Sequence, residues 1–370
     1  MIYYCAFYQL PTNRNTNYVG SLAANNKMDY IIETILKFSE VTIFAPIWHI
    51  RSEKGFKFHF GKKVRLKNSA LYCHPFSIES KYKIIRKLNS ILCRIWLFII
   101  LLKLSAKDSL ILYHEPMLSN VILLAKKIRK FSLILELEES YQDASPCLAK
   151  SLVKSENRII FNSDKFILST RTLIDRFNIG KPCVICHGNY KFKNLSCTQV
   201  KTNLIYSGII DTKKGGVFKA IQAMDYLPKY HLHITGTGDS IEAMLFLISK
   251  SKYQNITYHG VLTAKELDKL IESCYIGLNT QKITTNLETC FPSKILFYLT
   301  RNLKVVTGKT NSLRTSDVND LVYYYITDDP LSISECIKQC TKDININTKG
   351  YLDDLDNNFI KNLYSLLCNT

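Results

Sequence analysis

The sequence predicts an α/β protein with two successive parallel sheets, and three observations lead to this fold class. Short apolar runs alternate with amphipathic helical patterns along most of the 370 residues. The stretch from Leu204 to Asp239 contains a complete strand, glycine turn, helix and second strand. A polar segment over 191–203 lacks a hydrophobic period and separates the two alternating halves. Two such sheets joined by a linker are typical of a two-domain enzyme with a cleft.

The first half contains the apolar runs of one sheet. Strands are expected at 2–7, 41–46, 110–113, 133–137, 158–161 and 183–186. Helices are expected from about Met28 to Ile35, over 81–107 and 119–129, and near 170–177. Residues 48–77 alternate short apolar and basic pieces, which indicates a hairpin or an irregular loop region.

The second half repeats the alternation. Strands are expected at 204–206, 231–235, 256–258, 275–279, 303–306 and 322–326, and a last helix from about 358 to 367. Val217, Phe218, Ile221 and Met224 line one face of a helix that Pro228 ends. We therefore expect domains at 1–190 and 204–350, a linker over 191–203, and a C-terminal helix over 351–370.

Glycines stand where two strands of the second half end. Gly208 and Gly215 follow the first strand, and Gly236 and Gly238 follow the second. At the carboxyl edge of a parallel sheet, backbone N–H groups and helix N-termini point to the same place. This edge favours an anionic ligand that carries phosphate.

The positive charge is concentrated in one segment. The net charge is +18, and residues 51–130 hold eighteen basic and four acidic residues. Such a cluster indicates a polyanionic neighbour, unless it is only a solvated face. Lys outnumbers Arg and no nucleic-acid module is recognisable, so an anionic membrane surface is favoured over nucleic acid. The helix expected over 81–107, basic at its start and then apolar, lies either in the core or partly in a membrane interface.

The sequence also indicates the compartment. The longest apolar run, Ile95–Leu102, is far shorter than the ~20 residues of a membrane span, and no signal peptide is evident. The twelve cysteines are scattered, which favours reduced thiols in a cytosol. The Cys183–His187 segment matches a haem-attachment pattern, but its apolar character favours a buried strand.

Three histidines raise the question of a metal. His231 and His233 share one face of an expected strand, and His259 follows the next. No nearby Cys or carboxylate completes a ligand set, so we expect no metal.

Several segments resemble the GT-B glycosyltransferases, in particular the retaining family 4 members that build bacterial capsule and O-antigen polysaccharides. The similar segments are 206–215, 232–238, 258–263 and 291–299, with the acidic strand end at 135–141. The resemblance covers most of residues 130–310, and residues 1–50 follow the same plan more weakly. It implies two Rossmann-like domains that face a central cleft.

The resemblance also implies an activity. A hexosyl unit would pass from a nucleotide sugar to a lipid-linked saccharide, without a metal or other cofactor. The enzyme would be cytoplasmic and peripheral on the inner face of the plasma membrane. A nucleotide-sugar epimerase of the same shape and an inactive scaffold remain alternatives.

Lysines and a helix start are the expected donor contacts. Lys214 on the glycine turn and Lys294 at a helix start each place an ammonium near a diphosphate, whose charge grows as the sugar leaves. The N–H groups after Pro292-Ser293 favour the same charge. With Gly208, Gly215, Gly236 and Gly238, these residues form the expected donor site.

Carboxylates are the expected catalytic groups. Glu138 and Glu139 end a strand, so adjacent side chains point to opposite faces and at most one enters the cleft, unless both cap the next helix. The family commonly has Arg where this chain has Ile209, and two glutamates where it has Thr289 and Phe297. Glu288, one residue early, is the third candidate. Gly20, His114 and His187, with Glu115 beside His114, are expected on the acceptor side.

Overall fold

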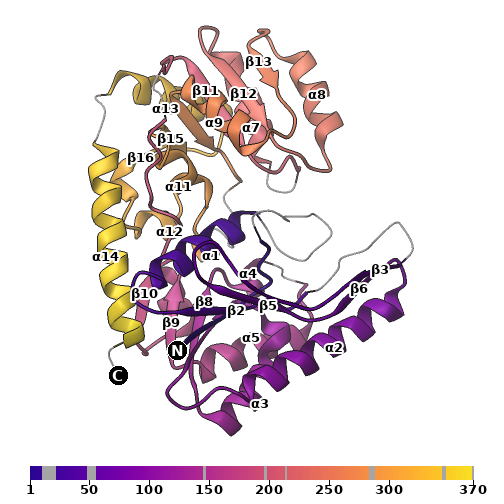
Figure 1. The fold of residues 1–370 in the computed structure, drawn as a ribbon. Coiled ribbons are helices and arrows are strands. Elements are labelled where there is room, and N and C mark those ends of the chain that lie inside the picture. The colour runs from indigo at the N-terminus through magenta and orange to yellow at the C-terminus, as the bar shows by residue number, and fades with distance from the viewer. Residues whose placement is uncertain are drawn as a thin grey trace. The chain divides into compact units, whose positions relative to one another are not determined.

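The computed structural model describes residues 1–10, 22–47, 56–144, 147–195, 198–212, 215–282, 288–343 and 347–368. The chain divides into two compact units. One unit is Met1–Asn189 with Asn358–Thr370, and the other is Tyr190–Asn357. Each unit has a mainly parallel sheet with helices packed on it, as Figure 1 shows. The α/β fold class is therefore confirmed.

The sheet of the first unit has eight strands, in the order β10-β9-β8-β7-β1-β2-β5-β4. All neighbours pair in parallel except β4 and β5, which are antiparallel. The bounds are β1 Ile2–Cys5, β2 Val41–Phe44, β4 Lys62–Arg65, β5 Leu71–His74, β7 Ser109–Tyr113, β8 Ser132–Leu137, β9 Lys165–Leu168 and β10 Cys183–Ile185. The chain runs outward from β1 to β4 and then returns to β7. The strand order therefore reverses between β1 and β7, and ligands of such sheets bind at that point.

Helices cover both faces of this sheet. Figure 1 shows α2 (Lys83–Leu101), α3 (Ser119–Arg129) and α5 (Lys150–Asn162) on one face, and α1 (Leu22–Ile35) on the other. The first three helices share a buried core with β1, β7 and β8. The shorter helices are α4 (Tyr141–Ala144) and α6 (Thr172–Phe177). Within the region 48–77, where a hairpin or an irregular loop is expected, β4 and β5 form an antiparallel hairpin. Beside it, β3 (Phe56–His59) pairs in antiparallel with β6 (Ser77–Ser80).

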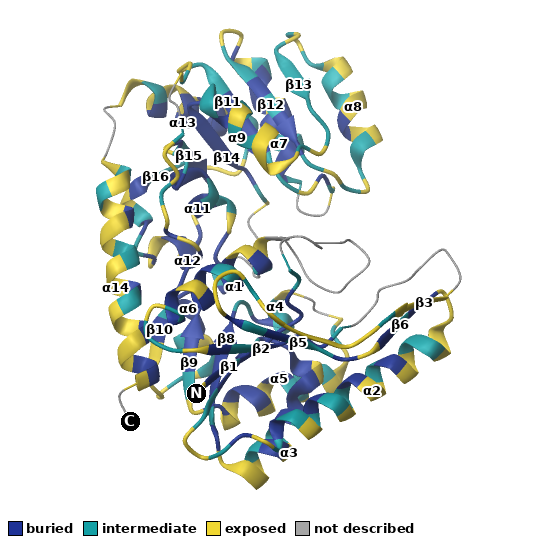
Figure 2. Cartoon of the chain, in the orientation of Figure 1, coloured by how far each residue is buried: buried dark blue, intermediate teal, exposed yellow. Residues whose placement is uncertain are grey.

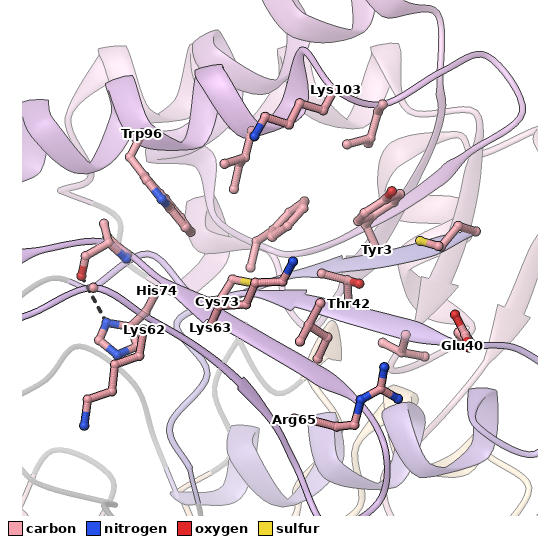
Figure 3. A pocket seen from close by; sticks show the side chains of 18 of the residues that line it. Tyr3, Glu40, Thr42, Lys62, Lys63, Arg65, Cys73, His74, Trp96 and Lys103 are labelled. Carbon is pink, nitrogen blue, oxygen red and sulfur yellow. Dashed lines mark hydrogen bonds between the residues drawn. The ribbon is translucent and has the colours of Figure 1, made fainter.

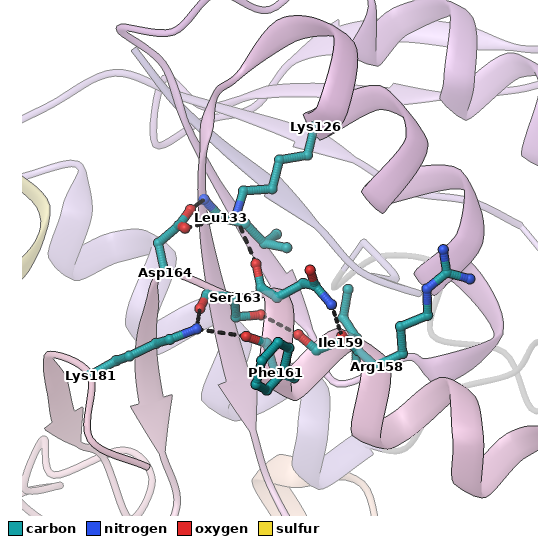
Figure 4. A network of polar contacts seen from close by, with 9 residues as sticks. Lys126, Leu133, Arg158, Ile159, Phe161, Ser163, Asp164 and Lys181 are labelled. Atoms are coloured by element: carbon teal, nitrogen blue, oxygen red, sulfur yellow. Dashed lines mark hydrogen bonds and ion pairs between the residues drawn. The ribbon is translucent and has the colours of Figure 1, made fainter.

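The strand expected at 158–161 is wrong, because those residues lie in α5. The last carbonyls of this helix have no intrahelical partner, and neighbouring lysines satisfy them. Figure 4 shows Lys181 Nζ donating to Phe161 O and Ser163 O, both at 2.6 Å. Lys126 Nζ donates to Asn162 O and to Asp164 Oδ1, both at 2.7 Å. In the sequence alone, the short apolar run at this end of α5 resembles a strand.

The second unit has six parallel strands in the order β13-β12-β11-β14-β15-β16. The strand bounds are β11 Asn203–Ser207, β12 His231–Thr235, β13 Ile256–Tyr258, β14 Ile276–Asn279, β15 Lys304–Thr307 and β16 Val322–Tyr324. The helices are α7 Gly216–Ala223, α8 Ile241–Lys250, α9 Ala264–Glu272, α11 Lys294–Leu299, α12 Asn311–Arg314 and α13 Pro330–Lys342. This is the doubly wound order, which reverses between β11 and β14. The six strands expected from the sequence are confirmed.

The C-terminal helix α14 spans Thr348–Cys368, so it begins three residues before the C-terminal helix expected over 351–370 and about ten residues before the helical pattern expected from 358. Its last part belongs to the first unit. There the ring of Phe359 stacks on Tyr30 at 5.4 Å, and Tyr364 meets Phe38 edge to face at 5.2 Å. Aromatic packing therefore fixes the end of the chain to α1.

Two glycine turns of the second unit approach each other through their backbones. Gly208 N donates to Thr235 O and Ile210 N to Thr237 O, both at 3.0 Å, so the pairing continues beyond β11 and β12. A Cβ on Gly236 would lie 1.9 Å from Gly208 O, and Gly236 has a φ of +135°. A Cβ on Gly238 would lie 1.9 Å from Ile210 O. Only glycine permits this contact.

Gly236→Ala should therefore destabilise the second unit by about 2–5 kcal/mol, from overpacking against backbone plus the strained φ. Gly260 is the matched control, because it also has a positive φ of +69° but open space around its Cβ position. Gly260→Ala should cost only about 1 kcal/mol. Urea unfolding followed by circular dichroism compares them, and equal losses would contradict the steric argument.

Candidate functional site

The helix α11 is fixed to the sheet of the second unit by one tyrosine. The ring of Tyr298 lies where Gly277 of β14 has no side chain, since a Cβ there would be 2.3 Å from Tyr298 Cγ. The Tyr298 hydroxyl accepts a hydrogen bond from Ser207 N at 2.9 Å. The tyrosine therefore holds α11 against the ends of β11 and β14, the two strands at which the sheet order reverses.

Lys294 lies one helical turn before Tyr298 and so on the same face of α11. Its Nζ is 3.7 Å from the centroid of the Tyr206 ring, a favourable cation–π geometry. A Cβ on Gly208, whose φ is +150°, would lie 2.5 Å from Lys294 Cε. The missing side chain at position 208 is therefore what lets the ammonium reach the carboxyl end of β11.

The helix α7 begins at the same edge. Gly215, with a φ of +60°, is its N-cap, and Thr280 Oγ1 donates to Gly216 O at 2.5 Å. This bond ties the helix start to the residue after β14. The free N–H groups of the first turn of α7 and the Lys294 ammonium both favour an anion.

The structure brings together most of the expected donor residues that it describes. Gly208, Gly236 and Gly238 meet in the two packed turns, and Lys294 lies against Gly208. Pro292 is buried and Ser293 is exposed at the start of α11. Lys214 and Gly20 lie outside the described residues.

Glu288 lies at another helix start. Its Oε2 accepts a hydrogen bond from Asn311 N at 2.8 Å, at the first residue of α12. Thr289 is buried, and the guanidinium of Arg301 lies 4.0 Å from the Phe297 ring centroid. A cation stacked on an aromatic ring stands where the family has its second glutamate.

The acidic segment of the first unit forms a buried cluster with α1. Glu138 Oε1 is 2.5 Å from Lys27 Nζ, and the fully buried Glu136 accepts a hydrogen bond from the Tyr4 hydroxyl. Burial, and after it the Glu138 carboxylate, raises the pKa of Glu136 to about 8. Burial alone would lower the pKa of Lys27, but Glu138 and other neighbours raise it overall. The cluster thus holds a charged pair beside a neutral carboxyl group.

The argument that Glu138 and Glu139 point to opposite faces of a strand is wrong, because β8 ends at Leu137 and both follow it. Glu139 is half-buried. The start of α4 is capped by another residue, since Ser140 Oγ accepts from Asp143 N at 3.3 Å.

The two histidines expected on the acceptor side are both buried. His114 stacks on Tyr141 with ring centroids 4.5 Å apart, and its Nε2 is 3.3 Å from Glu156 Oε1. His187 Nδ1 donates to Ser169 O at 2.7 Å. Next to His114, Glu115 lies just after β7, at the point where the sheet order reverses, and burial raises its pKa to about 8.

The histidines of the second unit lie in a row. His233 Nδ1 is 3.0 Å from His259 Nε2, and His231 Nε2 is 2.8 Å from Thr257 Oγ1. Among the residues that the structure describes, no group of three or more His, Cys, Asp or Glu side chains has metal-binding geometry. In the Cys183–His187 segment, Cys186 is buried and Cys183 is exposed at the first residue of β10.

Comparisons with known proteins identify the fold. No protein-family model and no curated protein matches the sequence. Among solved structures, an E. coli trehalose-6-phosphate structure with bound UDP-2-fluoro glucose has a TM-score of 0.67 and 10% identity, over 100% of this chain and 99% of that chain. The lipopolysaccharide outer core galactosyltransferase WaaB has a TM-score of 0.64 and 14% identity, over 99% and 98%. Anabaena Alr3699/HepE in complex with UDP has a TM-score of 0.63 and 10% identity, over 98% of this chain and 96% of that chain.

These neighbours are GT-B glycosyltransferases, so the chain has the GT-B fold, with two Rossmann-like domains. The fold expected from the sequence resemblance is confirmed. At these identities the likeness concerns the fold.

The sequence analysis did not single out three groups that the structure places beside candidate residues: Tyr206 beneath Lys294 in the second unit, and Lys27 and Tyr4 around Glu136 in the first unit. One signal was present. Glu136 interrupts an otherwise apolar strand two residues before Glu138, and a charged residue in a buried strand requires partners.

The raised pKa of Glu136 predicts a pH dependence of the first unit. In the unfolded chain the carboxyl ionises near its ordinary pKa of 4.5, whereas in the fold it holds its proton to about pH 8. The folded state therefore binds more protons between these values, and the free energy of unfolding falls as pH rises, by up to ~1.4 kcal/mol per pH unit. Glu136→Gln, which stays neutral, should remove this slope.

Tryptophan fluorescence during urea unfolding measures the effect, since Trp48 and Trp96 both belong to the first unit. Glu33→Gln, an exposed position on α1, is the control and should keep the wild-type slope. An unchanged slope in Glu136→Gln would show that this carboxyl is ionised in the fold.

Proposed function

We propose that this protein transfers a hexosyl unit from a nucleotide sugar to a lipid-linked saccharide in the synthesis of a surface polysaccharide, capsule or O-antigen. The observation that carries the proposal is the Lys294 ammonium at the reversal point of the second sheet, held there by Gly208 and Tyr298. Parallel sheets bind nucleotides at this edge. The GT-B fold and the UDP ligands of two similar structures support the same reading.

The donor half of the reaction is assigned to the second unit. The bond between the sugar's anomeric carbon and the diphosphate oxygen breaks, and negative charge develops on the diphosphate. Lys294 and Lys214, the glycine turns at 208, 215, 236 and 238, and the helix start at Pro292-Ser293 stabilise this charge. Glu288 is assigned to the ribose hydroxyls in place of the glutamate that Phe297 replaces.

The acceptor half is assigned to the first unit. Glu138 and Glu139 contact the acceptor hydroxyl or its neighbours, and the ion pair with Lys27 orients Glu138. Gly20, His114 and His187 are assigned to the same side. The two histidines are buried and support the loops that follow β7 and β10. A hydroxyl that attacks the anomeric carbon loses its proton, and an ionised carboxylate can accept it.

Lys294→Met tests the donor assignment. Methionine keeps the packing over Tyr206 but removes the charge, so the fold should be retained while the affinity for UDP falls about 10- to 100-fold, as expected for one charge-assisted contact. Calorimetric titration with UDP and with UDP sugars gives the dissociation constants. Lys265→Met, at an exposed position on α9, is the control. Equal affinity of both variants would remove Lys294 from the site.

The membrane assignment rests on α2. Its buried residues, Asn89, Cys93, Leu97 and Leu101, form one stripe. A second apolar stripe on the outer side is 48–75% exposed and consists of Ile84, Leu88, Ile91, Ile95 and Ile99. Figure 2 shows exposed residues at intervals along α2, between buried ones. Lysines and arginines flank the outer stripe, as in helices that lie in a membrane interface.

No helix that the structure describes is long and apolar enough to cross a membrane. We assign the protein to the inner face of the plasma membrane, with α2 lying in the interface. Exposed rings beside α2 extend the apolar surface, with Phe56 stacked on Tyr82 and Phe58 on Phe76.

Ile91→Glu should weaken binding to vesicles that contain phosphatidylglycerol, because it places a carboxylate in the exposed stripe, and high salt should release the wild-type protein. Phe246→Glu, at an exposed position of the second unit, is the matched control. Flotation at low and high salt measures both effects. Equal binding of the wild-type protein to neutral vesicles would contradict the assignment.

A further inference from the structure

The first unit contains a cavity of about 710 Å³ between α2 and the outer strands of its sheet. The strand register builds its floor. Two rows of side chains run across the sheet on the face toward α2: Tyr3–Thr42–Leu71–Arg65 and Phe44–Cys73–Lys63. Leu97 and Leu101 of α2 belong to one buried core with residues of β1 and β7, and Cys73 of β5 packs against this core, whereas β4 contributes no residue to it.

The walls of this cavity are largely apolar and aromatic. Tyr3 stacks on Phe44 at 5.2 Å, and Trp96 of α2 meets Phe44 edge to face at 6.4 Å. Ile100 and Leu104 continue the helix side. The volume suits one small ligand, and the walls suit a hydrocarbon.

Cations stand on two sides of the apolar space. Lys63 and Arg65 lie on β4, and Lys103 follows α2 on the opposite side (Figure 3). Among the described lining residues, Lys62 adds a fourth cation and Glu40 is the one carboxylate. The charge is therefore complementary to an anionic head group.

The cavity is continuous with the exposed aromatic surface beside α2. Phe76 lines the cavity and also contacts the rings of Phe58 and Phe60, at 6.3 and 6.0 Å. All three rings are exposed to solvent. The exposed rings and the cavity therefore share one residue, Phe76.

We propose that this cavity binds one hydrocarbon chain of a lipid phosphate, with the phosphate held by Lys63 and its neighbouring cations. The cavity lies on the face of the sheet beneath α2, at its outer strands, whereas Glu136 and Lys27, the neighbours of the proposed acceptor residue Glu138, lie on the face toward α1. It is therefore a second site, and it does not depend on the assigned glycosyl transfer. Lysines on an edge strand also protect against edge-to-edge pairing, which is the competing explanation for β4.

Dodecyl phosphate, used below its micelle-forming concentration, is the probe. In a Trp48→Phe background, dodecyl phosphate brominated near the chain end should quench Trp96, because bromine quenches only at contact. Inorganic phosphate should not bind measurably. No quenching of Trp96, or equally tight binding of the neutral dodecyl maltoside, would overturn the proposal.

Two variants and a control locate the head group and the chain. Lys63→Gln should raise the dissociation constant of dodecyl phosphate about tenfold, as for one charge-assisted contact. Lys67→Gln, an exposed position in the turn before β5, should leave it unchanged. If the lysines of β4 only protect the sheet edge, the two variants should have the same dissociation constant for dodecyl phosphate. That result would overturn the proposed site. Cys73→Phe fills the cavity and should abolish quenching while UDP binding by the second unit is retained; if it fails to fold, the quenching and the lysine pair decide.

Vesicles of brominated phosphatidylglycerol identify the source of the ligand. Quenching of Trp96 by both probes supports a membrane lipid, and quenching by the monomer alone supports a free single-chain amphiphile.

Discussion

An ammonium group that lies against a tyrosine ring, in space left by a missing Cβ, is the contact on which the proposed donor site depends. Lys294 reaches the end of β11 because Gly208 has no side chain, and Tyr298 holds their helix because Gly277 has none. A missing Cβ also allows the two turns to pack together, because Gly236 leaves space for the Gly208 carbonyl. The glycines thus act mainly by letting backbone and side chains approach. In the proposed donor site, the lysine and the start of α7 supply the charge that meets the diphosphate.

The first unit differs, because acidic side chains rather than cations lie at the carboxyl edge of its sheet, and most of them are buried. Burial raises the pKa of Glu136 and of Glu115, whereas Glu138 forms an ion pair with Lys27. In the proposed reaction, a carboxylate that follows β8 accepts the proton of the acceptor hydroxyl. In the proposed reaction, the second unit supplies cations for the leaving diphosphate and the first unit supplies a proton acceptor.

Much of the fold could be predicted from the sequence, because parallel strands are short apolar runs that end in turns. The strands of the second half and the helix at 119–129 follow from periodicity alone. The strand expected at 158–161 is wrong because the apolar residues in the last turn of an amphipathic helix, here Ile159 and Ile160 of α5, have the same pattern as a short strand. Lys294 was found through a motif, but its partner Tyr206 was not, since a cation–π contact has no sequence period. The cavity beneath α2 depends on which strands the helix leaves uncovered, which is a property of packing.

A crystal structure with bound UDP tests the central claim most directly. The account predicts the diphosphate at the carboxyl ends of β11 and β14, beside Gly208 and the start of α7, with Lys294 Nζ within ~3 Å of a phosphate oxygen. Clear density for the diphosphate elsewhere on the second unit, with Lys294 still packed on Tyr206 and out of reach, would contradict it.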